Sequence, residues 1–500
     1  MLTNQRLIAD LRRPDAYPHA VKAPVEVHQT HISIIFLAGD FAYKIKQAIK
    51  TDFLDYSTLR LRKHFCDEEI RLDRRFVQDL YLGVVPVTRS DDGIEIQGSG
   101  ETIEYAVKMR RFPDDALLSQ RIGSGKLTTS EVDQLAATVA GFHQKASVGK
   151  NGVAAEWPEF LRENAGQIIR TLASTANHKA STKLDVLGDW LDDFFGRSFT
   201  SIDDRVAAGF VRECHGDLHL ANVVHWENQL VPFDGIEFNE HLRWIDTLSD
   251  AAFLAMDFAA HNRLDLSRRF TNAYLERTGD YDSLHLLRLF LVYRSLVRAL
   301  AASMRDDQVD TNKHVALAHQ FTLGDVPQLW ITHGLSGSGK TTLSQNVIQR
   351  RDAIRLRSDI ERKRMFGLLP HMRPAAELTS KLYSDDSNKR TYLRLHELAR
   401  GVLAAGYSVI VDATFLKQAD RQRFRDLAEK EGVCFAILDC QSDVQTLRKR
   451  VADRANQGND ASDADIQVLE HQIANNEPLS DEERDLVVDI PDVMQFAKHL

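Results

Sequence analysis

One glycine-rich segment constrains the fold of this 500-residue chain more than any other feature. Residues 334–341 read Gly-Leu-Ser-Gly-Ser-Gly-Lys-Thr, between an apolar run typical of a buried β-strand and a segment with helical spacing. Closely spaced glycines let backbone amides wrap around phosphate oxygens, and the N-terminus of the next helix adds a positive dipole. Strand-like runs at 408–412 and 435–438 alternate with amphipathic segments. The pattern predicts an α/β P-loop NTPase domain with a parallel sheet.

The glycine-rich segment also predicts where a nucleotide binds. Lys340 is expected to reach the β- and γ-phosphates, and Thr341 to offer its hydroxyl to Mg²⁺. Asp412 ends a strand-like run and is the predicted second metal-side group, with a helix cap or a turn as the alternative. The predicted cofactor-binding residues are Gly334, Ser336, Gly337, Ser338, Gly339, Lys340, Thr341 and Thr342.

Three residues farther along are candidates for catalysis. Asp359 follows a short strand-like run and is either the base for an acceptor hydroxyl or the N-cap of the next helix. Arg450 and Arg454 share one helix face, which either closes over the transferring phosphoryl group or is an ordinary solvated face. This part of the chain resembles the small P-loop kinases grouped around gluconate kinases, zeta-type toxins and polynucleotide 5′-kinases. The resemblance implies the base role for Asp359 and the lid role for both arginines.

The chain before the glycine-rich segment has a different pattern. Two strands with a tight turn are expected within 31–46, followed by a helical segment, more strands and long helical stretches. This order predicts a sheet-rich lobe followed by a helical lobe, an α+β arrangement. Residues 324–327, Gly-Asp-Val-Pro, then interrupt the pattern. We therefore expect two domains, 1–323 and 324–500.

A second constellation lies in the helical lobe. Residues 215–222 read His-Gly-Asp-Leu-His-Leu-Ala-Asn, and Asp234 follows an apolar run. Asp217 is expected to face an acceptor hydroxyl while Asn222 and Asp234 hold Mg²⁺ against nucleotide phosphates. His215 and His219 are interpreted as loop scaffolding rather than metal ligands. The motif resembles the kinase catalytic loop in the form found in aminoglycoside phosphotransferases and choline kinases, which implies a protein-kinase-like bilobal domain.

The same resemblance implies a phosphate-anchoring lysine on a small-lobe strand, paired with a glutamate on the next helix. Lys44 is the predicted anchoring lysine, and Lys46 is the alternative because it lies on the same face of the strand. Glu69 is the predicted partner, with Glu68 as the fallback. Residues 107–112 correspond to the hinge against which an adenine would stack. A full GxGxxG loop before Lys44 is absent from the sequence, which disfavours a protein substrate.

The whole chain resembles bacterial fusions of an aminoglycoside phosphotransferase-like domain with a P-loop kinase-like domain. We therefore expect a bifunctional ATP- and Mg²⁺-dependent phosphotransferase acting on hydroxyl groups of small molecules. ATP is favoured over GTP because residues 388–391, Asn-Lys-Arg-Thr, lack the aspartate of a guanine-reading NKxD motif. The alternatives are a nucleic-acid 5′-hydroxyl kinase in the second domain, or a nucleotide-sensing regulator in place of one enzyme.

Composition narrows these alternatives. A formal net charge of -9 argues against broad binding to nucleic acid or to an anionic membrane, although a local basic patch could still bind either one. The four cysteines lack CxxC spacing, so neither a zinc site nor a disulfide framework is indicated. Without a long apolar run or a signal-peptide pattern, a cytoplasmic protein with no membrane attachment is expected. The sequence carries no signal for an oligomeric state.

Overall fold

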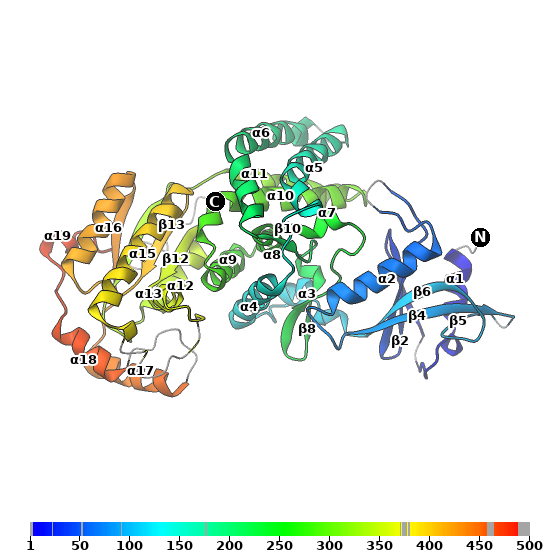
Figure 1. Cartoon of the computed structure of the whole chain (residues 1–500), viewed down its shortest axis with the longest axis horizontal. Helices are drawn as coiled ribbons and strands as arrows, with labels where there is room; N and C mark the ends of the chain where they lie inside the picture. The colour runs from blue at the N-terminus through cyan, green and yellow to red at the C-terminus, as the bar shows by residue number, and fades with distance from the viewer. Residues whose placement is uncertain are drawn as a thin grey trace. The chain divides into compact units, whose positions relative to one another are not determined.

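The computed structural model (Figure 1) describes residues 4–22, 24–51, 54–91, 93–175, 178–370, 372, 378, 381–457 and 465–488. The chain divides into two compact units. The first comprises Met1–Gln167 with Phe195–Leu254, and the second Ile168–Phe194 with Ala255–Leu500. The predicted division into domains 1–323 and 324–500 remains a prediction.

The first unit begins with an antiparallel six-stranded sheet. Its order is β1-β2-β3-β6-β4-β5, and helix α2 packs on β4 and β6. Thr58 starts α2 as its N-cap, because its hydroxyl accepts a hydrogen bond from the backbone of Leu61. The elements are α1 (Asn4–Leu11), η1 (Pro14–Ala16), β1 (Glu26–Gln29), β2 (Ser33–Ala38), β3 (Phe41–Lys46), α2 (Leu59–Asp73), β4 (Tyr81–Ser90), β5 (Gly93–Ile96) and β6 (Glu101–Arg110).

The alternation of side chains along β3 decides where its two lysines lie. Tyr43 and Ile45 belong to an apolar cluster that includes residues of α1. Ala42 belongs to a different cluster, which includes Cys66 of α2. Because side chains alternate along a strand, Lys44 and Lys46 share the face of Ala42 and point toward α2. The predicted hairpin of β2 and β3 is confirmed.

The rest of the first unit carries the loop at 215–222. Two short antiparallel pairs, β7 with β10 and β8 with β9, flank this loop in the chain. Helices α5, α6 and α8 cross the division between the units. The elements are η2 (Asp114–Ala116), α3 (Leu118–Gly123), α4 (Thr129–Lys145), α5 (Val153–Thr175), α6 (His178–Ala207), β7 (Val211–Glu213), η3 (Leu220–Asn222), β8 (Val223–Trp226), β9 (Gln229–Pro232), α7 (Glu240–Arg243), β10 (Trp244–Asp246) and α8 (Thr247–Ala260). This arrangement confirms the predicted sheet-rich lobe followed by a helical lobe.

The second unit contains a parallel four-stranded sheet in the order β12-β13-β11-β14. Strands β12 and β13 are buried along their whole length, as expected of a sheet covered on both faces. The predicted parallel α/β fold is confirmed. The elements are α9 (Leu264–Thr278), η4 (Tyr281–Ser283), α10 (Leu284–Ser303), α11 (Gln308–Thr322), β11 (Gln328–His333), α12 (Lys340–Arg350), β12 (Ala353–Arg357), α13 (Ser358–Met365), α15 (Asp385–Ala404), β13 (Ser408–Asp412), α16 (Gln418–Glu431), β14 (Cys434–Asp439), α17 (Val444–Gln457), α18 (Ile466–Ala474) and α19 (Asp481–Arg484).

Over the described ranges, none of the helices has both the length and the hydrophobicity required to cross a bilayer.

Candidate active sites

The loop at 215–222 is held by one buried carboxylate. Asp250, in the first turn of α8, accepts hydrogen bonds from the backbone amides of His215 and Gly216, each at 3.0 Å. His143 Nε2 lies 3.0 Å from the same carboxylate. Gly216 has φ 87°, and a Cβ there would lie 2.6 Å from the carbonyl oxygen of Leu242, so only glycine fits. These contacts fix the backbone on which Asp217 is mounted.

Both histidines of the loop contact protein groups. Backbone Asp217 N–H donates to His215 Nδ1 at 3.3 Å, so the proton is assigned to His215 Nε2, 2.9 Å from the carbonyl oxygen of Phe233. Burial lowers the pKa of His215 and favours this neutral ring. His219 Nδ1 accepts from the Ala221 amide, and its Nε2 lies 3.3 Å from Asp217 Oδ2. This geometry agrees with loop scaffolding.

The structure brings Asp217 and Asn222 into direct contact. The Asn222 side-chain amide donates to the backbone oxygen and to Oδ2 of Asp217, both at 3.0 Å. Its NH₂ group is therefore turned toward Asp217, which leaves Oδ1 as the atom suited to a cation. Asp234 lies just beyond β9 with φ 61°, and its amide donates to Tyr81 Oη at 3.0 Å. Amide and carboxylate oxygens from Asn222 and Asp234 suit the oxygen preference of Mg²⁺.

The two lysines of β3 share one buried carboxylate. Lys44 Nζ donates to Glu69 Oε1 at 3.0 Å, and Lys46 Nζ donates to Glu69 Oε2 at 2.6 Å. Lys44 also pairs with Asp234, whereas Lys46 pairs with Glu237. Burial alone would raise the pKa of Glu69, but the charges of both lysines outweigh it and lower this pKa to about 2. Because Lys44 reaches a predicted metal-side residue, the geometry favours it as the phosphate anchor.

Glu68, the fallback for Glu69, points elsewhere. Its carboxylate pairs with Arg71 at 2.8 Å and lies 3.8 Å from Arg243. Neither lysine of β3 is among its ion-pair partners in the described part of the chain. Glu69 is therefore the residue that connects α2 to the lysine pair.

Asp73 is a buried member of this site that the sequence analysis missed. Its Oδ1 accepts a hydrogen bond from the amide of Gly235 at 2.9 Å, while its Oδ2 has no hydrogen-bond partner among the described residues. Burial, together with the negative charges of Glu69 and Asp234, raises the pKa of Asp73 well above its usual range, which favours the neutral acid. Asp73 lies four residues after Glu69, so helical spacing was the signal that could have found it.

In the second unit, the glycine-rich loop adopts a backbone that requires its glycines. Gly334, Gly337 and Gly339 have φ 138°, 84° and 97°. A Cβ on Gly334 would lie 2.2 Å from the carbonyl oxygen of Cys440, so a side chain cannot fit there. Gly339 immediately precedes α12 and is its N-cap. The loop therefore presents backbone amides at the start of a helix, which is the geometry of an anion site.

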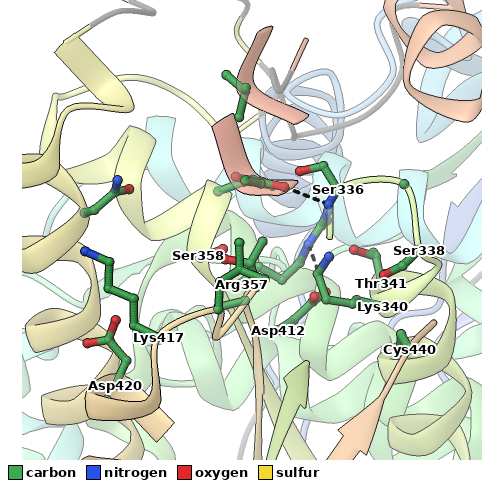
Figure 2. Close-up of a pocket in the computed structure, with 18 of the residues that line it drawn as sticks. Ser336, Ser338, Lys340, Thr341, Arg357, Ser358, Asp412, Lys417, Asp420 and Cys440 are labelled. Atoms are coloured by element: carbon green, nitrogen blue, oxygen red, sulfur yellow. Dashed lines mark hydrogen bonds and ion pairs between the residues drawn. The ribbon is translucent and has the colours of Figure 1, made fainter. Parts of the chain in front are cut away.

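The P-loop borders a cavity of about 1440 Å³. Figure 2 shows Ser336, Ser338, Lys340 and Thr341 together with Asp412, and Lys417 some distance from them. The lining includes every predicted nucleotide-binding residue of the loop except Gly334, and also Asp359, Asp412 and Arg450. The sequence analysis missed Arg357, Lys417, Asp420, Arg423 and Gln472, which also line it.

The contacts of the loop lysine and of its neighbours explain the shape of the loop. Lys340 Nζ donates to the carbonyl oxygen of Leu335 at 2.7 Å. The amide of Ser336 donates to Gln472 Oε1 at 2.9 Å, and Arg450 donates to the carbonyl oxygen of Gly337 at 3.2 Å. Residues of α17 and α18 thus close one side of the loop.

Asp412 ends β13 and is buried. Its Oδ2 accepts a hydrogen bond from Ser344 Oγ at 3.1 Å and lies 3.9 Å from Arg357 Nε. The Asp412 side chain lines the cavity. With the Thr341 hydroxyl nearby on the cavity wall, the donor set consists of oxygens and suits Mg²⁺.

The structure shows the contacts of two residues for which the sequence left alternatives open. Asp359 does not cap α13, because the N-cap is Arg357 and no side-chain capping bond is made. Asp359 lines the cavity instead, with Tyr383 Oη 3.5 Å from its Oδ1. Arg450 is exposed and donates to the carbonyl oxygen of Gly337 in the loop, and its role in catalysis stays a prediction. The side chain of Arg454 lies outside the described part of the structure.

Comparison with known proteins gives matches to each part of the chain. A family model described as an AAA domain matches residues 329–479. The Uncharacterized protein Rv2004c of Mycobacterium tuberculosis is 28% identical over 462 residues, which cover 90% of each chain. The GDP complex of wild-type aminoglycoside 2′-phosphotransferase-IIIa is 14% identical with a TM-score of 0.36, over 61% of this chain and 93% of that one. An unliganded sugar kinase from Janibacter sp. HTCC2649 is 19% identical with a TM-score of 0.26, over 34% and 92%. The AAA match covers the second site and confirms the predicted P-loop domain.

Proposed function

We propose that this protein is a bifunctional phosphotransferase that moves the γ-phosphoryl group of ATP to hydroxyl groups of small-molecule acceptors, with Mg²⁺ at each site. The observation that supports this proposal is that each unit brings together a lysine, oxygen donors suited to Mg²⁺ and a further carboxylate. In the first unit Lys44, Asn222, Asp234 and Asp217 are linked by direct contacts or through the same loops. In the second, a single cavity is lined by Lys340, Thr341, Asp412 and Asp359.

At the first site, Asp217 is the proposed base. Its carboxylate accepts the proton of the acceptor hydroxyl while the acceptor oxygen forms a bond to the γ-phosphorus. The bond from that phosphorus to the β–γ bridging oxygen breaks, and ADP leaves with the electron pair. Asn222 and His219 hold the Asp217 carboxylate in position. Lys44 offers positive charge to the phosphates, and Glu69 holds Lys44 in place.

At the second site, the amides of the P-loop and Lys340 are proposed to bind the phosphates. Lys340 would exchange its bond with the Leu335 carbonyl for phosphate oxygens. Asp359 is the proposed base, and Arg450 is placed beside the loop to stabilise negative charge on the transferring group. A magnesium ion held by Thr341 and Asp412 would neutralise phosphate charge and favour departure of ADP.

Phosphoryl transfer from labelled ATP to sugars, nucleosides, aminoglycosides and oligonucleotides tests the proposal. Wild type, Asp217→Asn and Lys340→Ala are compared in parallel. Transfer lost only in Asp217→Asn assigns that acceptor to the first site, and transfer lost only in Lys340→Ala assigns it to the second. Label on an oligonucleotide that depends on Lys340 would support a nucleic-acid 5′-hydroxyl kinase instead. Binding of ATP with no transfer to any acceptor would contradict the enzymatic proposal and favour a regulator.

A further inference from the structure

Helix α9 covers the edge of the P-loop sheet and lies before the segment that matches the AAA family model. Strand β12 is the edge strand, and Asn272 of α9 pairs with its backbone. The Asn272 side chain donates to the carbonyl oxygen of Ala353 at 3.0 Å and accepts from the amide of Arg355 at 2.7 Å. One amide side chain thereby satisfies the donor and the acceptor that an edge strand leaves unpaired.

One turn after Asn272, Glu276 brings negative charge to the same edge. Glu276 Oε1 accepts from Arg355 Nε at 2.8 Å and lies 2.7 Å from its Nη2. Its Oε2 lies 3.7 Å from Nη1 of Arg357. All three side chains are at least nine-tenths buried. A buried carboxylate with two guanidinium neighbours is strongly held, because each buried charge needs its counter-charge.

Arg355 and Arg357, which both lie against Glu276, also lie close to residues of the nucleotide site. Arg355 Nη1 lies 3.4 Å from the carbonyl oxygen of Thr341, the residue with the predicted metal-side hydroxyl. Arg357 Nε lies 3.9 Å from Asp412 Oδ2. Arg357 therefore stands between two carboxylates, one on α9 and one at the nucleotide site. The charge on Glu276 competes with Asp412 for this guanidinium.

We propose that α9 is part of the P-loop site, and that Glu276 is a positioning residue that keeps Arg357 from neutralising the metal-side carboxylate of Asp412. The inference rests on the nucleotide-binding role proposed for that site. If Glu276 loses its charge, Arg357 moves closer to Asp412 and the carboxylate becomes a weaker ligand. Outer groups that orient metal ligands commonly change metal affinity by about 10- to 100-fold.

Manganese binding to the full chain with ATP, followed by electron paramagnetic resonance, tests the inference. The Lys340-dependent part is isolated by subtracting the signal of Lys340→Ala. Glu276→Gln is expected to weaken Mn²⁺ binding at this site by about tenfold, with less than a twofold change in ATP affinity measured in EDTA. Asp265→Asn is the matched control, because Asp265 lies on the same helix, loses the same charge and pairs with Arg263. It is expected to leave both affinities unchanged.

A second substitution separates positioning from mere loss of structure. The double variant Glu276→Gln with Arg357→Gln is expected to recover Mn²⁺ affinity to within about threefold of wild type, since the competing guanidinium is gone. If Glu276→Gln does not fold, the Mn²⁺ affinity of Arg357→Gln alone is measured. It is expected to equal or exceed that of wild type.

Four outcomes contradict the inference. The first is an unchanged Mn²⁺ affinity in Glu276→Gln, and the second is an equal loss of metal-free ATP binding in that variant. The third is a fall in Mn²⁺ affinity in Arg357→Gln, and the fourth is a double variant that binds Mn²⁺ as weakly as Glu276→Gln. If wild type shows no Lys340-dependent binding of Mn²⁺ and ATP, the proposed function of the site itself fails, and the inference fails with it.

Discussion

Replacing Glu69 with glutamine tests the charge network that connects α2 to the lysine pair. Glu69 is fully buried, and its two carboxylate oxygens accept hydrogen bonds from Lys44 Nζ at 3.0 Å and from Lys46 Nζ at 2.6 Å. Glutamine keeps the shape and one oxygen acceptor, but it removes the charge and turns an NH₂ group toward one lysine. Because Asp234 and Glu237 still pair with the lysines, the expected cost lies at the lower end of the range for breaking a buried pair, about 3 kcal/mol.

Hydrogen exchange with mass spectrometry measures this cost in peptides from α2. A loss of about 3 kcal/mol corresponds to roughly a 100-fold increase in exchange through opening. Glu68→Gln is the matched control, one residue earlier in the same helix. Glu68 pairs with the half-exposed Arg71, so its loss is expected to cost about 1 kcal/mol or less, roughly a fivefold increase. Equal protection of α2 in the two variants would refute the reasoning.

Three further outcomes are expected. Gly334→Ala should weaken Lys340-dependent ATP binding at least about tenfold, because its Cβ would lie 2.2 Å from a backbone oxygen. Gly432 has φ 65° and open space around it, so the control Gly432→Ala should leave ATP binding unchanged. Burial lowers the pKa of His314 from 6.5 to about 4, so the folded state favours the neutral ring. The stability that this provides is complete above pH 6.5 and is lost as the pH falls toward 4, with a loss of about 2 kcal/mol at pH 5. His314→Leu should remove that part of the pH dependence in urea titrations. Asp73→Asn should change stability by less than about 1 kcal/mol, because burial raises the pKa of Asp73 and favours the neutral acid, and asparagine keeps the oxygen that accepts from Gly235. A loss comparable to that of Glu69→Gln would contradict this.

Local spacing made the loop at 215–222 and the P-loop predictable. Asp217 and Asn222 lie five residues apart and touch, so the sequence contains their geometry almost entirely. The same holds for the glycines of the P-loop, whose positive φ angles follow from their type and spacing. The choice between Lys44 and Lys46 was different, since both lie on one strand face and only the positions of Asp234 and Glu237 distinguish them.

Residues that act over long sequence separations could not be predicted in this way. Asp250 holds the loop at 215–222 from the start of α8, and Gln472 reaches the P-loop from α18. Glu276 lies about 80 residues before the arginine it pairs with on β12. Each is a polar residue in a helix, and its sequence context resembles that of many solvated residues. Only tertiary packing, which brings these helices to the loops, distinguishes them.

The stoichiometry of MgATP binding tests the central claim most directly, since it requires no knowledge of the acceptor. Calorimetric titration with a non-hydrolysable ATP analogue would compare wild type, Asp234→Asn, Lys340→Ala and the double variant. The account predicts two bound nucleotides in wild type, one in each single variant and none in the double variant. A single nucleotide in wild type, lost completely in one of the single variants, would contradict the claim that the chain contains two phosphotransferase sites.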